Sequence, residues 1–255
     1  MTRTNGPRPA EEQARAPGRE GSVCDLAGPL LVALLAGDDR ASEGVFVTAA
    51  SRGADLALLA RDLVGPALDE IGCMWHRGEI SEAEEHLATA LVLRAFTRRA
   101  TTIPPPPLGA PRLLLSCLAG EFHEVGARLV AEVARMTGWQ AEMLGANTPR
   151  PAVLAYIAQR RPEAVGLSFA LAAHLPECAR TVAEIRKVAP GVKVLVGGYA
   201  FRHEAALCGL TGADACFADA VALRDWLVTH RPKSARCCAP SVDALRKKVS
   251  GARKR

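Results

Sequence analysis

Hydrophobic residues recur every three or four positions from residue 23 to about residue 99, which is the spacing of amphipathic helices. The longest run has Asp55 as a suitable N-cap and contains Pro66, where we expect a kink. Ser81 and Glu84 fit a capping box at the start of the last helix. Four helices with short connections predict a four-helix bundle over residues 23–102. The expected helices cover residues 26–37, 41–52, 56–77 and 82–99.

A different rhythm follows a proline-rich stretch at residues 103–111, which predicts a stiff linker. Beyond it, short apolar runs alternate with amphipathic segments, so residues 112–230 are expected to form a Rossmann-like α/β domain with a five-stranded parallel sheet. The rule of right-handed crossovers favours a flavodoxin-like strand order. We expect strands at residues 112–118, 140–144, 164–169, 193–196 and 213–217, and helices at 124–137, 150–161, 176–189, 200–208 and 219–229.

The two ends of the chain differ in composition from the rest. Residues 1–22 are polar and rich in proline, glycine and arginine, which predicts a disordered segment. Residues 231–255 form a basic tail with a net charge of +8, which leaves −3 for the remainder of a chain whose total is +5. Such a tail can contact nucleic acid, a membrane surface or an acidic partner, or serve only as a solubilising end. Any affinity of this sparse tail for DNA would be weak and non-specific.

The eight cysteines are scattered, and none forms a Cys-x-x-Cys pair. Five of them lie in apolar runs and are interpreted as small core residues of a cytosolic protein: Cys73, Cys117, Cys178, Cys208 and Cys216. Cys237 and Cys238 are adjacent in the tail and leave a redox role open. No signal peptide is visible, and no apolar run approaches the ~20 residues that span a bilayer. We therefore expect a soluble, cytoplasmic protein without membrane contacts.

Chemically distinctive residues lie where three predicted strands end. The first strand leads into the loop Gly120-Glu121-Phe122-His123-Glu124-Val125-Gly126, the third ends at Ser168, and the fourth ends at Gly197-Gly198. These ends meet at one edge of a parallel sheet, where such sheets bind ligands. Glu121 can orient the imidazole of His123, and the glycines remove side chains where a ligand would approach the backbone. A solvated loop histidine is the alternative interpretation.

The surroundings of His123 in the sequence restrict the kind of ligand. No Gly-x-Gly-x-x-Gly follows the first strand, which argues against an ordinary dinucleotide site. No second and third metal ligand lies near His123 in the sequence, which argues against zinc. A single histidine instead suits a metal whose other positions are filled by a macrocycle.

The predicted bundle carries a second cluster of polar and aromatic residues. Trp75 and His76 end the third helix, and Glu85 and His86 lie in the first turns of the fourth. Because Glu84 is used in the capping box, Glu85 is free for another contact. The two pairs lie across a tight turn, and we expect them to meet at the end of the bundle that faces the sheet. The alternative is a core tryptophan beside solvated charges at helix ends.

These residues resemble the cobalamin-binding proteins built from a helical cap and a Rossmann-like domain. That family has Asp-x-His-x-x-Gly, then Ser-x-Leu and Gly-Gly at later strand ends; this chain has Glu121 to Gly126, Ser168-Phe169-Ala170 and Gly197-Gly198, over a resemblance that covers residues 23–230. Glu121 replaces the aspartate and Ala170 the leucine. The resemblance implies that His123 is the lower axial ligand of cobalt and that the nucleotide tail of the cofactor runs into the sheet. The implied cofactor contacts there are Glu121, Phe122, His123, Val125, Gly126, Ser168, Gly197 and Gly198.

Within this family, Trp75 followed nine residues later by Glu85-His86 is similar to the cap of CarH-type photoreceptors, which bind adenosylcobalamin. The resemblance implies that Trp75 packs on the upper adenosyl group, that Glu85 binds its ribose, and that His86 supports the same face. His76 is a candidate upper ligand of cobalt after photolysis. CarH-type proteins usually begin with a MerR-like helix-turn-helix domain, and no segment of this sequence resembles one.

The resemblance therefore implies a light-sensing regulatory protein rather than an enzyme. Photolysis of adenosylcobalamin would change its conformation or association, and its output would pass through a transcription regulator, through a homo-oligomer, or through the basic tail. A corrinoid methyl carrier of a methyltransferase system is the alternative, since it shares the fold. A fold that has lost its cofactor is the third interpretation, because two motif positions differ.

Overall fold

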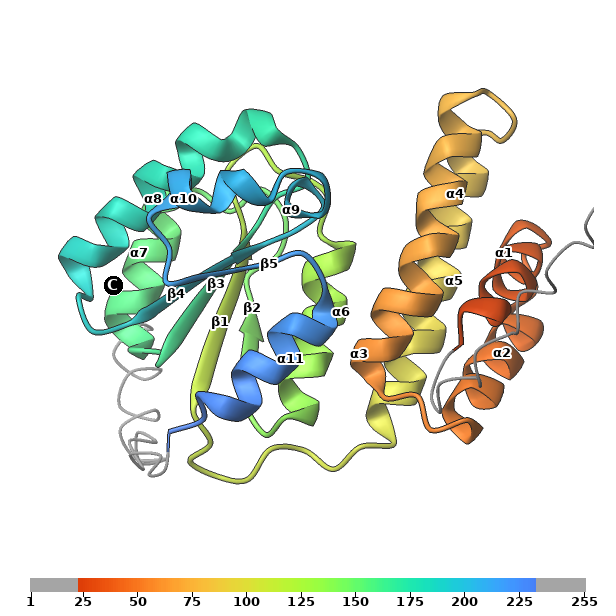
Figure 1. Cartoon of the computed structure of the whole chain (residues 1–255), viewed down its shortest axis with the longest axis horizontal. Helices are drawn as coiled ribbons and strands as arrows, with labels where there is room; N and C mark the ends of the chain where they lie inside the picture. Colours follow the sequence, from red (N-terminus) through yellow and green to blue (C-terminus); the bar gives the residue numbers. More distant parts are fainter. Residues whose placement is uncertain (1–22, 233–255) are drawn as a thin grey trace, which may run out of the picture.

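The computed structural model describes residues 23–232 and combines helices with a five-stranded parallel sheet (Figure 1). This arrangement confirms the predicted fold class. The predicted disordered segment 1–22 lies outside the described residues, as does the tail from residue 233 onward with Cys237 and Cys238. Within the described part of the chain, no helix is both long and apolar enough to cross a membrane.

The helical part, here called the cap, runs from η1 to α5, and two of its helices, α3 and α5, begin where capping side chains were predicted. Asp55 accepts a hydrogen bond from the Leu58 amide at 2.9 Å. Ser81 and Glu84 form the reciprocal capping box, with the Ser81 amide donating to Glu84 Oε2 at 2.7 Å. The cap comprises η1 (Cys24–Leu26), α1 (Ala27–Leu35), α2 (Asp39–Ser51), α3 (Leu56–Leu58), η2 (Leu59–Val64), α4 (Gly65–His76) and α5 (Glu82–Thr101).

The long third helix of the cap is interrupted before Pro66. Proline has no amide hydrogen to donate to the carbonyl four residues earlier, so the α-helical hydrogen bonding cannot continue through it. The chain adopts a π-helical turn, η2, in which the Gly65 amide donates to the carbonyl of Ala60. A π-helical turn therefore lies on the N-terminal side of Pro66, where a kink was expected.

The second part, here called the sheet domain, runs from β1 to α11 with strand order β2-β1-β3-β4-β5, as predicted. Its strands are β1 (Arg112–Cys117), β2 (Gln140–Met143), β3 (Ala164–Ser168), β4 (Lys193–Gly197) and β5 (Ala215–Phe217). Its longer helices are α6 (Val125–Met136), α7 (Arg150–Arg160), α8 (Leu175–Val188) and α11 (Ala220–Thr229). The single helix predicted at 200–208 is wrong: this segment forms α9 (Ala200–His203), η4 (Ala205–Leu207) and the start of α10 (Cys208–Thr211).

The cap packs against one face of the sheet domain. Helices α6 and α11 lie between the sheet and the cap, and α7 and α8 cover the opposite face (Figure 1). Leu129 and Val133 of α6 share a buried cluster with the apolar residues of the cap. Two ion pairs also join the parts: Arg202 to Asp69 at 2.9 Å, and Arg224 to Asp55 at 2.7 Å.

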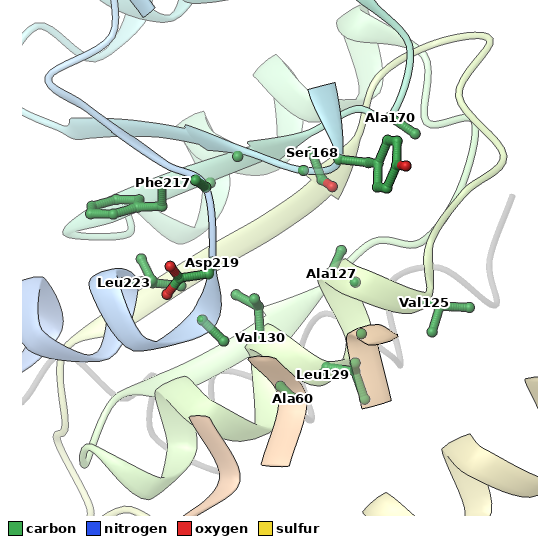
Figure 2. Close-up of a pocket in the computed structure, with 18 of the residues that line it drawn as sticks. Ala60, Val125, Ala127, Leu129, Val130, Ser168, Ala170, Phe217, Asp219 and Leu223 are labelled. Atoms are coloured by element: carbon green, nitrogen blue, oxygen red, sulfur yellow. The ribbon is translucent and has the colours of Figure 1, made fainter. Parts of the chain in front are cut away.

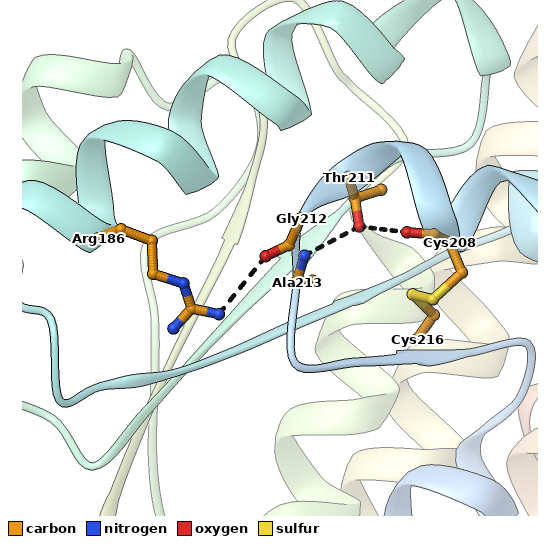
Figure 3. Close-up of a disulfide and its surroundings, with 6 residues drawn as sticks. All are labelled: Arg186, Cys208, Thr211, Gly212, Ala213 and Cys216. Atoms are coloured by element: carbon orange, nitrogen blue, oxygen red, sulfur yellow. Dashed lines mark hydrogen bonds between the residues drawn. A yellow bond between two sulfur atoms is a disulfide. The ribbon is translucent and has the colours of Figure 1, made fainter.

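The cysteines correct one sequence-based interpretation. Cys117 and Cys178 are buried free thiols, and burial raises the pKa of each to about 12. Cys73 is exposed, because it lies two residues after buried Ile71 and so on the other side of α4. Cys208 and Cys216 are not core thiols but form a disulfide between the start of α10 and β5 (Figure 3). The short turn between these elements brings their Cα atoms to 5.8 Å.

Candidate functional site

The loop after β1 holds a fully buried carboxylate beneath an exposed histidine. Glu121 has no exposed surface, whereas the His123 side chain is 66% exposed. Glu121 Oε1 accepts the His123 amide at 2.8 Å and lies 2.5 Å from His123 Nδ1. A carboxylate can only accept here, so the proton belongs on Nδ1 and the lone pair of Nε2 faces outward. This is the arrangement that prepares a histidine to bind a metal.

The other oxygen of Glu121 has partners of its own. Oε2 accepts the Ala170 amide at 2.7 Å and lies 3.0 Å from Nδ1 of His174. Burial alone would raise the pKa of Glu121, but the amides of Ala170 and His123 and the His123 ring outweigh it, so the pKa is lowered. The carboxyl is therefore ionised and held from both sides. His174 was not singled out from the sequence, because only the loop after β3 brings it to Glu121.

A cavity of about 240 Å³ lies beside this loop, between the sheet domain and the cap. Figure 2 shows Ser168 on the strand side of the cavity, with Ala127 and Val130 of α6 on the helix side. Apolar side chains dominate the wall, and charged groups belong to Arg61, Asp69, Arg202 and Asp219. The predicted residues that line it are His123, Val125, Gly126, Ser168, Gly197 and Gly198. Glu121 lies behind His123, and Phe122 is 69% exposed outside the cavity.

The glycines of the cavity have two different roles. A Cβ atom at Gly126 would meet no protein atom within 4 Å, so this position leaves open space. A Cβ atom at Gly198, where φ is +118°, would collide with the carbonyl oxygen of Phe169, and one at Gly197 would come within 3.2 Å of the Phe217 carbonyl oxygen. The absence of side chains at Gly197-Gly198 therefore makes room for the backbone of the protein itself, and the approach of a ligand there stays a prediction.

The predicted cluster of the cap lies at the tip of the α4–α5 hairpin, at the end of the molecule toward which β1 runs (Figure 1). Trp75 is 46% exposed, and its ring centroid is 5.5 Å from that of His76. Glu85 accepts a hydrogen bond from Thr89 Oγ1 at 3.0 Å, and its Oε2 lies 3.4 Å from His86 Nε2. These four residues do not line the cavity.

Other residues of the cap, not singled out from the sequence, form the cap side of the cavity. They lie on η2 and α4, two to four turns before Trp75: Ala60, Arg61, Val64, Gly65, Leu68 and Asp69. The spacing of Ala60, Val64 and Leu68 is visible in the sequence. The same spacing is typical of an ordinary core face, so it gives no signal of a cavity.

Comparisons with known proteins place the chain in a class. Two family profiles, each described as a B12 binding domain, match residues 26–99 and 111–224. The chain therefore belongs to the B12-binding, or cobalamin-binding, family, as the resemblance of its motifs predicted.

The chain is also similar to individual proteins of known name or structure. The chain is 34% identical over 138 residues to "HTH-type transcriptional repressor CarA" of Myxococcus xanthus and 32% identical over 149 residues to "HTH-type transcriptional repressor CarH" of the same organism. These matches cover 54% and 58% of this chain but only 46% and 49% of the relatives, so they span about half of each relative's length. The monomethylamine corrinoid protein of Methanosarcina barkeri has the same fold, with a TM-score of 0.62, 15% identity, and 80% of this chain and 98% of that chain covered.

The described residues fit the corrinoid cofactor of the family. Among them, no group of three or more His, Cys, Asp or Glu side chains is arranged to hold a metal ion, whereas a corrin needs only one axial ligand from the protein. His123 offers Nε2 at the edge of the sheet with Nδ1 fixed by a buried carboxylate. The longer side chain of Glu121, where the family has aspartate, still reaches the histidine.

Proposed function

We propose that the protein is a B12-dependent regulatory protein that binds adenosylcobalamin and responds to light. The observation that carries the proposal is the pairing of the outward-facing His123 with the buried Glu121. The similarity to the CarA and CarH repressors supports regulation rather than catalysis as its role. When bound, adenosylcobalamin supplies a cobalt–carbon bond that light can cleave.

In this proposal the two parts of the protein hold opposite faces of the cofactor. His123 binds cobalt from below, and Glu121 keeps its imidazole in the correct tautomer. Trp75 covers the adenosyl group, Glu85 accepts hydrogen bonds from its ribose, and His86 supports the same face. His76 would be available as a metal ligand on that face when no adenosyl group is bound. The exposure of Trp75 is consistent with a side chain whose packing partner is a ligand.

The response requires different contacts in the two states, because a ligand shifts a conformation only by its differential affinity. Loss of the adenosyl group removes a bulky partner of Trp75 and frees the tip of the α4–α5 hairpin to move against the sheet domain. The changed surface then acts on a transcription regulator or on a second copy of this chain.

The test is reconstitution with adenosylcobalamin in the dark, followed by illumination. We expect a change in the absorption spectrum and a change in elution volume in size-exclusion chromatography. His123→Ala should give dark and lit spectra that lack histidine ligation. Trp75→Ala should lower the preference for adenosylcobalamin over methylcobalamin about tenfold, the equivalent of ~1.4 kcal/mol. An unchanged spectrum together with an unchanged elution volume would contradict the proposal.

A corrinoid methyl carrier is the second candidate, and the open tip of the cap favours it. A carrier must present the upper face of cobalt to partner enzymes, and Trp75 and His86 are both exposed in this structure. In that case the wild-type protein prefers methylcobalamin, Trp75→Ala changes this preference little, and the methylated protein serves a corrinoid methyltransferase. The two candidates are separated by the same pair of binding measurements.

A further inference from the structure

An ion pair joins the cap side and the sheet-domain side of the cavity. Arg202 of α9 and Asp69 of α4 both line the cavity, and Arg202 Nη1 lies 2.9 Å from Asp69 Oδ2. Neither side chain is buried: Arg202 is 30% exposed and Asp69 is 44% exposed. An exposed pair of this kind contributes little to stability, typically less than ~1 kcal/mol. A weak ion pair is one that a competing anion can replace.

Two further residues, Gly65 and Tyr199, lie next to the guanidinium group of Arg202. A Cβ atom at Gly65 would lie 2.7 Å from Nη2 of Arg202, so the absence of a side chain at Gly65 makes room for the group. The guanidinium carbon is also 5.7 Å from the centre of the Tyr199 ring. The position of Arg202 is therefore set by Gly65 and Tyr199 as well as by Asp69.

Arg61, a second arginine of the cavity, is differently placed. It binds Asp62, its neighbour on η2, through Nε at 2.7 Å and Nη2 at 2.8 Å. This bidentate pair lies within one helical segment and does not join the two walls of the cavity. Arg202 instead uses Nη1 on Asp69 and comes from the segment after β4, at the ligand-binding edge of the sheet.

We propose that Arg202 binds the phosphodiester of the cobalamin nucleotide tail, and that Asp69 holds Arg202 in position until this anion replaces it. The proposal rests on cobalamin binding through His123. Both His123 and Arg202 line the same cavity, so a cofactor bound to His123 presents its tail to the cavity. The phosphodiester is the anionic group of that tail, and a guanidinium is well suited to bind it with more than one hydrogen bond. Arg202 is thus a specificity residue that selects corrinoids with a nucleotide tail.

The test compares adenosylcobalamin with adenosylcobinamide, which lacks the phosphodiester and the nucleotide, in equilibrium titrations in the dark. Arg202→Gln should weaken cobalamin binding about tenfold and cobinamide binding less than twofold, and Arg202→Lys should fall in between because the charge is kept. Asp69→Asn should strengthen cobalamin binding about threefold, since Arg202 no longer has a competing carboxylate. Arg224→Gln is the matched control: it breaks the other ion pair between cap and sheet domain, outside the cavity, and should affect both ligands less than twofold.

Equal weakening of both ligands by Arg202→Gln would overturn the proposal, as would no weakening of either. The proposal would also be overturned if Asp69→Asn weakened cobalamin binding as much as Arg202→Gln does. Equal losses would mean that the ion pair only holds the cap and the sheet domain together. Thermal unfolding of the free variants shows that each is folded. Cobinamide binding separates this proposal from the one before it: if cobinamide binds but the ligand preference does not depend on Arg202, only the role of Arg202 is wrong.

Discussion

The two sides of the candidate site are built in different ways. On the sheet side, the side chain of Glu121 is buried and contacts two backbone amides and two histidine rings, so His123 is held in position without a ligand. On the cap side, Trp75 and His86 are exposed, and the contacts of Glu85 lie within its own helix. The lower face of the site is preorganised, whereas the upper face consists of side chains on a helical hairpin.

This difference shows on which side of the site ligand binding must supply the free energy that orders the side chains. If His123 ligates the metal as proposed, this ligation needs little rearrangement, because the ordering cost is already met in folding. Contacts of Trp75 with an upper ligand must instead order a half-exposed side chain, so they depend strongly on what that ligand is. Under the proposed function, the cap is thus the side that would distinguish one corrinoid from another, and the sheet side is the one that would retain all of them.

Replacing two tryptophans, one on each side, should give the largest difference in stability between the sheet domain and the cap. Trp139 of the sheet domain is buried, and its Nε1–H donates to the carbonyl of Leu227 at 3.0 Å. Trp139→Ala should lower the free energy of unfolding by about 3–5 kcal/mol, because it leaves a large cavity. Trp75→Ala should lower it by less than ~1 kcal/mol, since nearly half of that side chain is already exposed. Urea unfolding measures both, and similar losses would show that the tip of the cap is a structural element.

The carboxylate beneath His123 gives the next test. Glu121→Ala leaves the amides of Ala170 and His123 without their acceptor and empties a fully buried position, so it should lower the free energy of unfolding by about 2–4 kcal/mol. It should also weaken cobalamin binding by at least ~10-fold, the usual effect of losing such a support. Glu121→Gln, which keeps the shape and one oxygen, should lose less in both measurements. A loss below ~1 kcal/mol for the alanine variant would mean that this side is not preorganised.

As the pH falls, the sheet domain should lose stability at a higher pH than the cap. Asp214 accepts from the Val194 amide at 2.7 Å and from Arg186 at 2.6 Å. Burial would raise the pKa of Asp214, but these donors outweigh it and lower the pKa below its ordinary value of 3.8. The stabilisation is therefore fully present above that ordinary value and is lost as the pH falls through the lowered pKa. In the cap, Glu79 and Glu84 also have lowered pKa values, caused by Arg77 and Ser81 respectively, but they lie at the surface.

Asp214→Asn measures that contribution and should lower the free energy of unfolding at neutral pH by about 1–2 kcal/mol. Its stability should then depend less on pH than that of the wild type as the pH falls below about 4 and through the lowered pKa of Asp214. Unfolding is followed by near-UV circular dichroism, which reports on Trp139 and Trp226 in the sheet domain. Equal pH dependence of variant and wild type would show that Asp214 is not the group that titrates.

Local patterns were enough to predict the fold. Helix spacing, the Asp55 and Ser81 caps and the alternation of strands with helices each depend on residues close in sequence, and the structure confirms them. The segment 200–208 was predicted wrongly because its composition suits a helix. The backbone instead leaves the helical conformation at Glu204 and passes through a 3-10 turn, η4, before α10.

The candidate site was predictable only in part. His123 and its support by Glu121 follow from a spacing of two residues. His174, Asp69 and Arg202 come to the site from three other elements, and the sequence contains no local signal of these contacts. The Cys208–Cys216 disulfide was missed for a different reason: apolar neighbours are equally typical of buried thiols and of paired ones.

The π-helical turn at Leu59–Val64 sets the rotational phase of everything after it. Each residue of an α-helix advances the side-chain direction by about 100°, so one extra residue accommodated in a wide turn rotates the rest of the helix by that amount. The direction in which Trp75 and His76 point around the helix axis is therefore set more than two turns earlier. That place lies beside the cavity, where Pro66 prevents a regular α-helical turn. A helix that could regain regular winding there would turn the same two rings toward a different side of the hairpin. The helical geometry before α4 and the direction of the side chains at its C-terminal end therefore cannot change independently.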